Sequence, residues 1–275
     1  MPKIVVTQPI HPQVLRTLQA HGEVVVNPGP EPWPAAVLLQ HLADADAMMA
    51  FMPDKVDRET LAHAPRLKTI ACALKGYDNF DLAACADAGV VVSFVPDLLT
   101  EPTAELAIGL AIATARNLLQ GDRLMRQGRY AGWRPILYGV GLRGATVAVV
   151  GLGAVGRAIV DRLQGFDCAE ILGVDPLATD ARVVQTSLRD AVARADFVLL
   201  AVPLVNTSVH LVNGALLQQA KPGQIVVNVG RGSVVDEAAM AQALRAGQIA
   251  GYAADVYEME DWLLSARPAQ VHPDL

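Results

Sequence analysis

The sequence contains few cysteines, few aromatic residues and no long uninterrupted apolar run. Its three cysteines, Cys72, Cys85 and Cys168, are far apart and form no C-x-x-C pair, which argues against a disulfide framework and against a zinc site. No apolar run approaches the ~18 residues that a membrane-spanning helix needs, and the first apolar stretch turns polar too soon for a signal peptide. We therefore expect a cytoplasmic protein without a membrane partner.

Positive charge is also scarce. The 275 residues include 22 Lys and Arg against 28 Asp and Glu, a formal net charge of −6. This balance argues against nucleic acid or an anionic membrane as the main partner. Hydrophobic residues make up 52% of the chain and charged residues 18%, so the chain can form a core. Its length suits two domains.

Short apolar strands alternate with helical patterns along the first hundred residues. Strands are expected at 4–6, 24–26, 47–51, 67–72 and 90–92, with helices between them, for instance at 35–42. Such alternation predicts an α/β fold in which helices cover both faces of a parallel sheet. This stretch has no glycine-rich motif, so we assign residues 1–99 to a smaller, flavodoxin-like substrate domain.

A glycine motif follows a second, stronger strand pattern at 146–150. The motif, G-L-G-A-V-G at 151–156, opens a helix pattern at 157–163, which is the context of a dinucleotide-binding fold. Gly151 permits the tight turn, Gly153 lets the backbone approach a pyrophosphate, and Gly156 lets the helix pack closely on the sheet. The N–H groups and the positive end of the helix attract the phosphates. The alternative is a tight turn between strand and helix that binds nothing.

An acidic residue completes this pattern. The apolar run at 171–174 ends on Asp175, which lies 175 − 156 = 19 residues after Gly156, near the ~20 expected of a dinucleotide fold. A carboxylate at this point can accept hydrogen bonds from both ribose hydroxyls and would repel a 2′-phosphate. The sequence therefore predicts NAD, in preference to NADP, as the cofactor.

Residues 100–275 are expected to form this NAD-binding domain, a second doubly wound parallel sheet of the Rossmann type. Thr100 and Pro102 begin a long apolar helix that runs to about residue 119. Because this helix leads from one domain into the other, we interpret it as a hinge. Residues 121–143 are polar and irregular, and we interpret them as an arm that packs on another subunit.

Charged side chains follow three of the predicted strands, where open parallel sheets bind their ligands. Arg231 lies between two glycines, and its planar fork suits an oxyanion. Lys75 precedes Gly76 and adds a point charge. Each cation taken alone is more often a solvated surface charge, but their common position at strand ends favours a site. Glu258 and Glu260 follow the last strand, and a solvated acidic loop explains them equally well.

Longer segments resemble the D-2-hydroxyacid dehydrogenase family, and within it the phosphite dehydrogenase branch. The similar segments are A-F-M-P-D at 50–54, C-A-L-K-G-Y-D-N-F-D at 72–81, F-V-P-D-L-L-T at 94–100, P-T-A-E-L-A-I-G-L at 102–110, R-G-S-V-V-D-E at 231–237 and G-Y-A-A-D-V-Y-E-M-E-D-W at 251–262. The similarity runs nearly end to end. The A-L-K-G and E-M-E-D-W segments are the ones particular to the phosphite branch.

The resemblance implies an oxidoreductase that oxidises phosphite to phosphate with NAD, as a homodimer. It implies that Arg231 anchors the substrate, that Lys75 also binds it, and that Glu260 orients the catalytic histidine, so these three are the expected catalytic residues. The other expected substrate-binding residues are Gly76, Met52, Leu74, Leu99, Thr103, Trp133 and Tyr138. The expected cofactor-binding residues are Gly151, Gly153, Ala154, Val155, Gly156, Asp175, Pro203 and Asp255.

One departure from the family concerns the catalytic histidine. The family has it in a Thr-Pro-His segment that this sequence does not contain, and we interpret His272 as a bystander. We therefore expect either a fragment or a truncated product whose first domain lacks its C-terminal completion. Two other functions stay open. One is a dehydrogenase of a small D-2-hydroxy acid, and the other is an NAD-sensing protein without turnover, similar to the family's corepressors.

Overall fold

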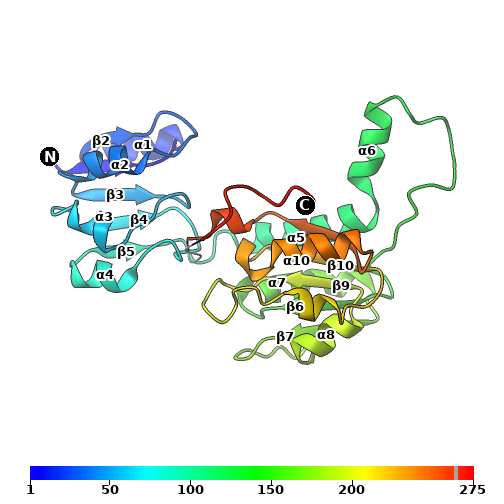
Figure 1. Ribbon diagram of the computed structural model, residues 1–275. Coiled ribbons are helices and arrows are strands. Elements are labelled where there is room, and N and C mark those ends of the chain that lie inside the picture. Colours follow the sequence, from blue (N-terminus) through cyan, green and yellow to red (C-terminus); the bar gives the residue numbers. More distant parts are fainter. Residues whose placement is uncertain (263–265) are drawn as a thin grey trace. The chain divides into compact units, whose positions relative to one another are not determined.

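The computed structural model describes residues 1–262 and 266–275 and divides into two compact units, Met1–Leu99 and Thr100–Leu275 (Figure 1). Each unit is a parallel sheet with helices on its faces, so the predicted α/β class is confirmed. Among the described residues, no helix is both long enough and apolar enough to cross a membrane.

The first unit contains a five-stranded parallel sheet. Its strands are β1 (Lys3–Val6), β2 (Glu23–Val26), β3 (Ala47–Ala50), β4 (Thr69–Cys72) and β5 (Val91–Ser93), in the order β2-β1-β3-β4-β5. The helices are α1 (Pro12–Gln19), α2 (Ala35–Leu42), α3 (Arg58–Ala62) and α4 (Leu82–Asp87). This strand order is that of flavodoxin-like folds, which bind ligands beyond the carboxyl ends of the strands.

The second unit contains a six-stranded parallel sheet in the order β11-β10-β9-β6-β7-β8. Its strands are β6 (Thr146–Val150), β7 (Glu170–Val174), β8 (Val184–Gln185), β9 (Phe197–Leu200), β10 (Gln224–Asn228) and β11 (Ile249–Ala254). Numbered within the unit, this is the 3-2-1-4-5-6 order of the dinucleotide-binding fold, read from the β8 edge. The strand order reverses beside β6, so the glycine motif that follows β6 lies where such folds bind their ligand.

Both faces of the second sheet are buried, which explains why its strands are apolar throughout. Side chains alternate between the faces along β6, so that Val147 and Val149 pack in one core and Ala148 and Val150 in the other. The first core lies under α5 (Thr100–Ala115) and α7 (Ala154–Leu163). The second lies under α8 (Leu188–Arg194), α9 (Gly214–Leu217) and α10 (Glu237–Arg245).

The long helix expected to reach residue 119 is shorter than predicted. Helix α5 ends at Ala115, and Asn117 adopts a left-handed conformation, with φ 53°, before α6 (Leu118–Arg126) begins. Asn tolerates this conformation better than most residues. Its side-chain amide also donates to the carbonyl oxygen of Tyr138, 3.0 Å away. Residues 121–143 were predicted to be irregular, but α6 covers residues 121–126 of this stretch. From here on, the arm means α6 together with residues 127–141.

Candidate cofactor and substrate site

The glycine motif forms a tight turn from β6 into α7. Gly151 has φ 92°, and a Cβ there would lie 2.7 Å from the carbonyl oxygen of Ala201. A Cβ on Gly156 would lie 1.8 Å from the carbonyl oxygen of Gly151, so the helix can start this close to the strand only with glycine. A Cβ on Gly153 would meet nothing within 4 Å. Gly153 therefore faces open space at the start of α7, where the phosphates of a dinucleotide fit.

Asp175 follows β7 and closes the turn from the other side. Its Oδ2 accepts a hydrogen bond from the Leu152 N–H at 2.8 Å, and its Oδ1 accepts from the N–H groups of Leu177 and Ala178, both at 2.8 Å. Burial acts to raise the pKa of the Asp175 carboxyl, but these donors together hold that pKa below its usual value. The side chain is thus an ionised, fixed acceptor beside the motif.

Arg231 occupies a tight turn after β10. A Cβ on Gly230 would lie 2.6 Å from the carbonyl oxygen of Val202, and one on Gly232 would lie 1.9 Å from the carbonyl carbon of Tyr257. Only glycines therefore allow the turn to pass between these two segments. The side-chain amide of Asn228 donates to the Arg231 carbonyl oxygen at 2.8 Å, which fixes the backbone that carries the guanidinium.

Two acids lie in the electrostatic field of Arg231. Desolvation raises the pKa of Asp255 and of Glu260 above the usual range, and the positive charge of Arg231 counteracts part of both shifts. Glu260 ends the short 3₁₀ turn η3 (Glu258–Glu260), and its Oε2 accepts weakly from the Tyr257 N–H at 3.4 Å. The structure therefore brings together Arg231, Asp255 and Glu260 of the predicted residues. Pro203 follows β9 at the same edge of the sheet.

Glu258, which the sequence left open as a solvated acid, is instead part of a partly buried network, with 12% of its side chain exposed. Its Oε1 lies 2.8 Å from His210 Nε2 and accepts from the Glu237 N–H at 3.2 Å. Glu237 is 3% exposed, and its Oε1 in turn accepts from the Glu258 N–H at 2.8 Å. Its Oε2 accepts from the backbone N–H of His272 at 3.1 Å. Sequence reasoning missed this cluster, and no local pattern around His210 signals it.

In the first unit, the predicted residues Met52, Leu74, Lys75 and Gly76 follow the carboxyl ends of β3 and β4. The Cys72 thiol lies 3.8 Å from the Leu74 carbonyl oxygen and 3.4 Å from that of Gly76, so it folds the loop back over the strand end. The Leu74 carbonyl oxygen also accepts from the Val95 N–H at 3.0 Å. Lys75 therefore belongs to a loop that is fixed against the sheet.

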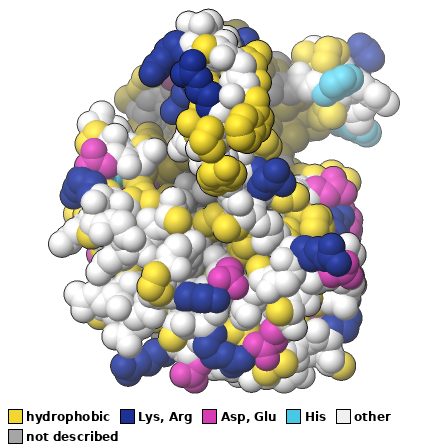
Figure 2. Space-filling model, turned by 90° about the vertical axis from the view of Figure 1, so that its right-hand side faces the viewer, with side chains coloured by type: hydrophobic (Ala, Val, Ile, Leu, Met, Phe, Trp, Pro, Cys, Tyr) yellow, Lys and Arg dark blue, Asp and Glu magenta, His cyan; other side chains and the backbone are white. Residues whose placement is uncertain are grey.

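The four remaining predicted residues lie elsewhere. Leu99 ends the first unit, and Thr103 lies in the first turn of α5. Trp133 and Tyr138 are on the arm, with 82% and 79% of their surface exposed. Figure 2 shows apolar side chains gathered on the part of the second unit that protrudes at the top of the view.

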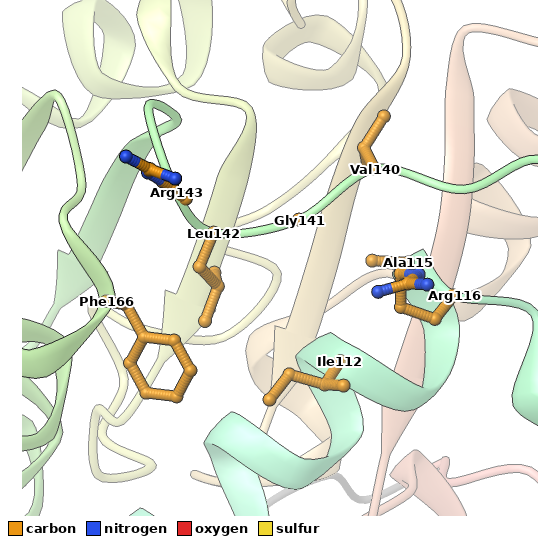
Figure 3. Close-up of a pocket in the computed structure, with 8 residues that line it drawn as sticks. All are labelled: Ile112, Ala115, Arg116, Val140, Gly141, Leu142, Arg143 and Phe166. Carbon is orange, nitrogen blue, oxygen red and sulfur yellow. The ribbon is translucent and has the colours of Figure 1, made fainter.

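A cavity of about 240 Å³ lies at the base of the arm, but it is not the cofactor site. It is lined by Ile112, Ala115, Arg116, Val140, Gly141, Leu142, Arg143 and Phe166 (Figure 3). Leu142 and Arg143 precede β6, and Phe166 precedes β7, so this cavity lies at the amino edge of the sheet. The glycine motif and Arg231 lie at the opposite, carboxyl edge.

Comparison with known proteins identifies the family. Residues 108–273 match the family model described as "D-isomer specific 2-hydroxyacid dehydrogenase, NAD binding domain". The chain therefore belongs to the D-isomer-specific 2-hydroxyacid dehydrogenase family. This family includes oxidoreductases that use NAD or NADP, and the glycine motif and Asp175 fit the adenosine and pyrophosphate part of such a cofactor.

Several relatives share most of the length of the chain. The glyoxylate reductase of Pyrococcus horikoshii is 34% identical over 270 residues, which cover 95% of this chain and 81% of the relative. A crystal structure of a protein from Thermus thermophilus is 33% identical, with a TM-score of 0.88, over 93% of this chain and 82% of that one. A glyoxylate/hydroxypyruvate reductase of Sinorhizobium meliloti, in complex with NADP and malonate, is 34% identical with a TM-score of 0.83, over 94% and 80%.

Proposed function

We propose that this chain transfers hydride between a nicotinamide cofactor and a small 2-hydroxy acid or the corresponding 2-oxo acid, of the size of glyoxylate or hydroxypyruvate. The observation that carries this proposal is Arg231, fixed between two glycines and beside two acids at the carboxyl edge of the dinucleotide-binding sheet. The relatives named as glyoxylate reductases support the 2-oxo acid more strongly than phosphite.

The residues of the second unit suggest how the substrate is held. The Arg231 guanidinium presents a planar fork that can bind a carboxylate through two parallel hydrogen bonds. The positive charge of Arg231 acts on Glu260. Desolvation nevertheless raises the pKa of the Glu260 carboxyl, which suits a side chain that shares a proton with a neighbouring group. The bound nicotinamide supplies or accepts the hydride. Asp175, as a fixed anion, favours NAD because a 2′-phosphate would be repelled.

Phosphite oxidation is the second candidate, and Lys75 is the observation that favours it. Phosphite is a small dianion, so a second cation would add more to its binding than to that of a monocarboxylate. Lys75 follows β4 in a loop fixed by Cys72 and Val95, within the A-L-K-G segment that resembles the phosphite branch. On this hypothesis Lys75 binds the phosphite dianion.

A single panel of assays separates these candidates. The 275-residue chain is mixed with NADH and glyoxylate or hydroxypyruvate, and separately with NAD and phosphite or a series of D-2-hydroxy acids, while NADH absorbance is followed. Turnover of the carbon acids alone supports the first proposal, and turnover of phosphite establishes the second. Binding of NADH without turnover of any of these substrates would contradict both and favour an NAD-sensing protein.

Lys75→Ala sharpens the distinction. If phosphite is the substrate, this substitution raises the KM for phosphite at least about tenfold and changes the affinity for NAD by less than about twofold. Lys68→Ala is the matched control, because Lys68 precedes β4 at the opposite end of the same strand and is exposed. Equal losses of substrate and NAD affinity in the Lys75 variant would contradict its role as a substrate ligand.

We also propose that the chain is a homodimer in which the arm contacts the second copy. Trp133, Ile136 and Tyr138 are all more than half exposed on the arm. Apolar surface of this extent is typical of a protein interface.

A further inference from the structure

The backbone of Leu152, inside the glycine motif, is held by two charged side chains at once. Its N–H donates to Asp175 Oδ2 at 2.8 Å, and its carbonyl oxygen accepts from Arg157 Nε at 2.9 Å. Arg157 is on α7, directly after Gly156. The turn that faces the pyrophosphate is therefore fixed by an anion after β7 and a cation on α7.

The same two side chains also hold the loop that follows β7. Asp175 Oδ1 accepts from the N–H groups of Leu177 and Ala178, and Arg157 Nη2 donates to the Thr179 carbonyl oxygen at 3.3 Å. From β8, the Gln185 side-chain amide donates to the carbonyl oxygens of Asp175 and Ala178, at 3.0 and 3.4 Å. The turn and the loop thus form one hydrogen-bonded unit.

This arrangement limits what Asp175 can still bind. A carboxylate has about four acceptor positions, and the three backbone donors leave about one of them, on Oδ2. Asp175 cannot swing away from an incoming group without losing these three hydrogen bonds. A 2′-phosphate would therefore meet a fixed negative charge, whereas a ribose hydroxyl would meet a fixed acceptor.

We propose that Arg157 is a positioning residue for cofactor selection. Its planar fork ties the glycine turn to the loop after β7, and it thereby keeps Asp175 in the position that accepts NAD and rejects NADP. This inference rests on the proposed preference for NAD. Arg157 acts through geometry, since its positive charge alone would attract a 2′-phosphate and favour NADP.

The test is the binding of NADH and NADPH to the 275-residue chain, followed by nicotinamide fluorescence. Arg157→Lys keeps the charge but lacks the fork that reaches two carbonyl oxygens. We expect it to weaken NADH binding about tenfold, in line with the loss of charge-assisted hydrogen bonds. We also expect it to reduce the preference for NADH over NADPH in the same direction as Asp175→Ala.

Arg162→Gln is the matched control. Arg162 is on the same helix, but its guanidinium donates to the carboxylates of Glu101 and Glu105, at 2.7 and 3.1 Å. Both nucleotides should bind this variant within about twofold of the wild type. Gln185→Leu provides a second variant should Arg157→Lys fail to fold, because it loosens the same loop from the β8 side without removing a charge.

The possible outcomes distinguish the positioning role of Arg157 from the proposed preference for NAD. A wild-type preference for NADH that both Arg157→Lys and Gln185→Leu retain, with unchanged affinity, would overturn the role of Arg157 alone. A wild-type chain that binds NADH and NADPH equally would overturn the preference for NAD, and the positioning role with it. A reduced preference in Arg157→Lys with an unchanged Arg162→Gln supports the inference.

Discussion

Nε2 of His210 lies 2.8 Å from Oε1 of Glu258, across 48 residues of sequence. His210 adopts a left-handed conformation, with φ 49°, and its N–H donates to the Ser233 carbonyl oxygen at 2.7 Å. A non-glycine residue in this conformation costs about 1–2 kcal/mol, so the contacts of His210 must offset that cost. The pair connects the loop after β9 to η3, the turn that carries Glu260.

Replacing Glu258 should therefore destabilise the second unit. Glu258→Ala leaves the Glu237 N–H and the His210 ring without their acceptor, and we expect a loss of about 1–3 kcal/mol in the free energy of unfolding. Urea denaturation measures this loss. Glu260→Ala is the control, since the Glu260 carboxylate accepts a weak hydrogen bond at 3.4 Å, and its removal should cost about 0.5 kcal/mol or less. Equal stabilities of the two variants would contradict a structural role for Glu258.

The first unit should show an acid-dependent contribution from Asp57. The Lys55 ammonium and the Thr60 N–H lower the pKa of the Asp57 carboxyl to about 2, and Asp57 caps α3. Because the folded-state pKa is lower than the unfolded value of about 4, the stabilisation is present above pH ~4 and is lost as the pH falls towards about 2. Asp57→Ala should cost about 1 kcal/mol at neutral pH.

The difference between wild type and Asp57→Ala, measured by chemical denaturation, should narrow as the pH is lowered from about 5 to about 3. A difference that stays constant over this range would show that the charge of Asp57 contributes nothing and that its hydrogen bond alone caps the helix.

The glycine motif offers a pair of substitutions with opposite outcomes. Gly156→Ala would press its Cβ against the Gly151 carbonyl oxygen, 1.8 Å away, and should cost about 3 kcal/mol of stability. Gly153→Ala meets no atom within 4 Å, so its cost should stay below about 1 kcal/mol. It should nevertheless weaken NADH binding at least about tenfold, because its methyl group would occupy the space of the phosphates.

Thermal unfolding and NADH titration of the two glycine variants separate packing from binding. If Gly153→Ala binds NADH as tightly as the wild type, the pyrophosphate does not lie over this residue.

The arm should determine the oligomeric state. Trp133→Lys introduces a charge at a residue that is 82% exposed, so folding should be unaffected while a dimer dissociates. Light scattering after size-exclusion chromatography would then give the 29.1 kDa monomer instead of twice that mass. Val184→Lys, at an exposed apolar residue on β8, is the control and should leave the mass unchanged. A wild-type monomer would contradict the proposed dimer directly.

Local patterns explain why much of the fold could be predicted. Strand β6, the glycine turn and α7 follow one another without interruption, and the apolar runs and glycines that define them are visible in the sequence. The glycines around Arg231 could be noticed in the same way. Their physical reason, the close approach of Val202 and Tyr257, could not, because those segments are distant in the sequence.

Long-range contacts explain what the sequence did not reveal. The burial of Glu258 depends on His210 and on Glu237, 48 and 21 residues away. The end of α5 depends on the arm, where the Val140 N–H donates to the Ala115 carbonyl oxygen at 3.1 Å. The asparagine at 117 is compatible with a left-handed conformation but does not by itself predict one. Of the three backbone donors to Asp175, Leu177 and Ala178 are its near neighbours in the sequence, but Leu152 is 23 residues away and is brought to it by the fold.

The order of strands along the chain has a consequence for synthesis on the ribosome. The fifth strand of the first unit ends at Ser93, whereas the first strand of the second sheet begins at Thr146. At a translation rate of about 5–20 residues per second, roughly 3–10 seconds pass between these two points. All five strands of the first sheet can therefore pair before any strand of the second sheet has emerged from the ribosome. The edge strands of the two sheets then do not compete for pairing partners in the nascent chain.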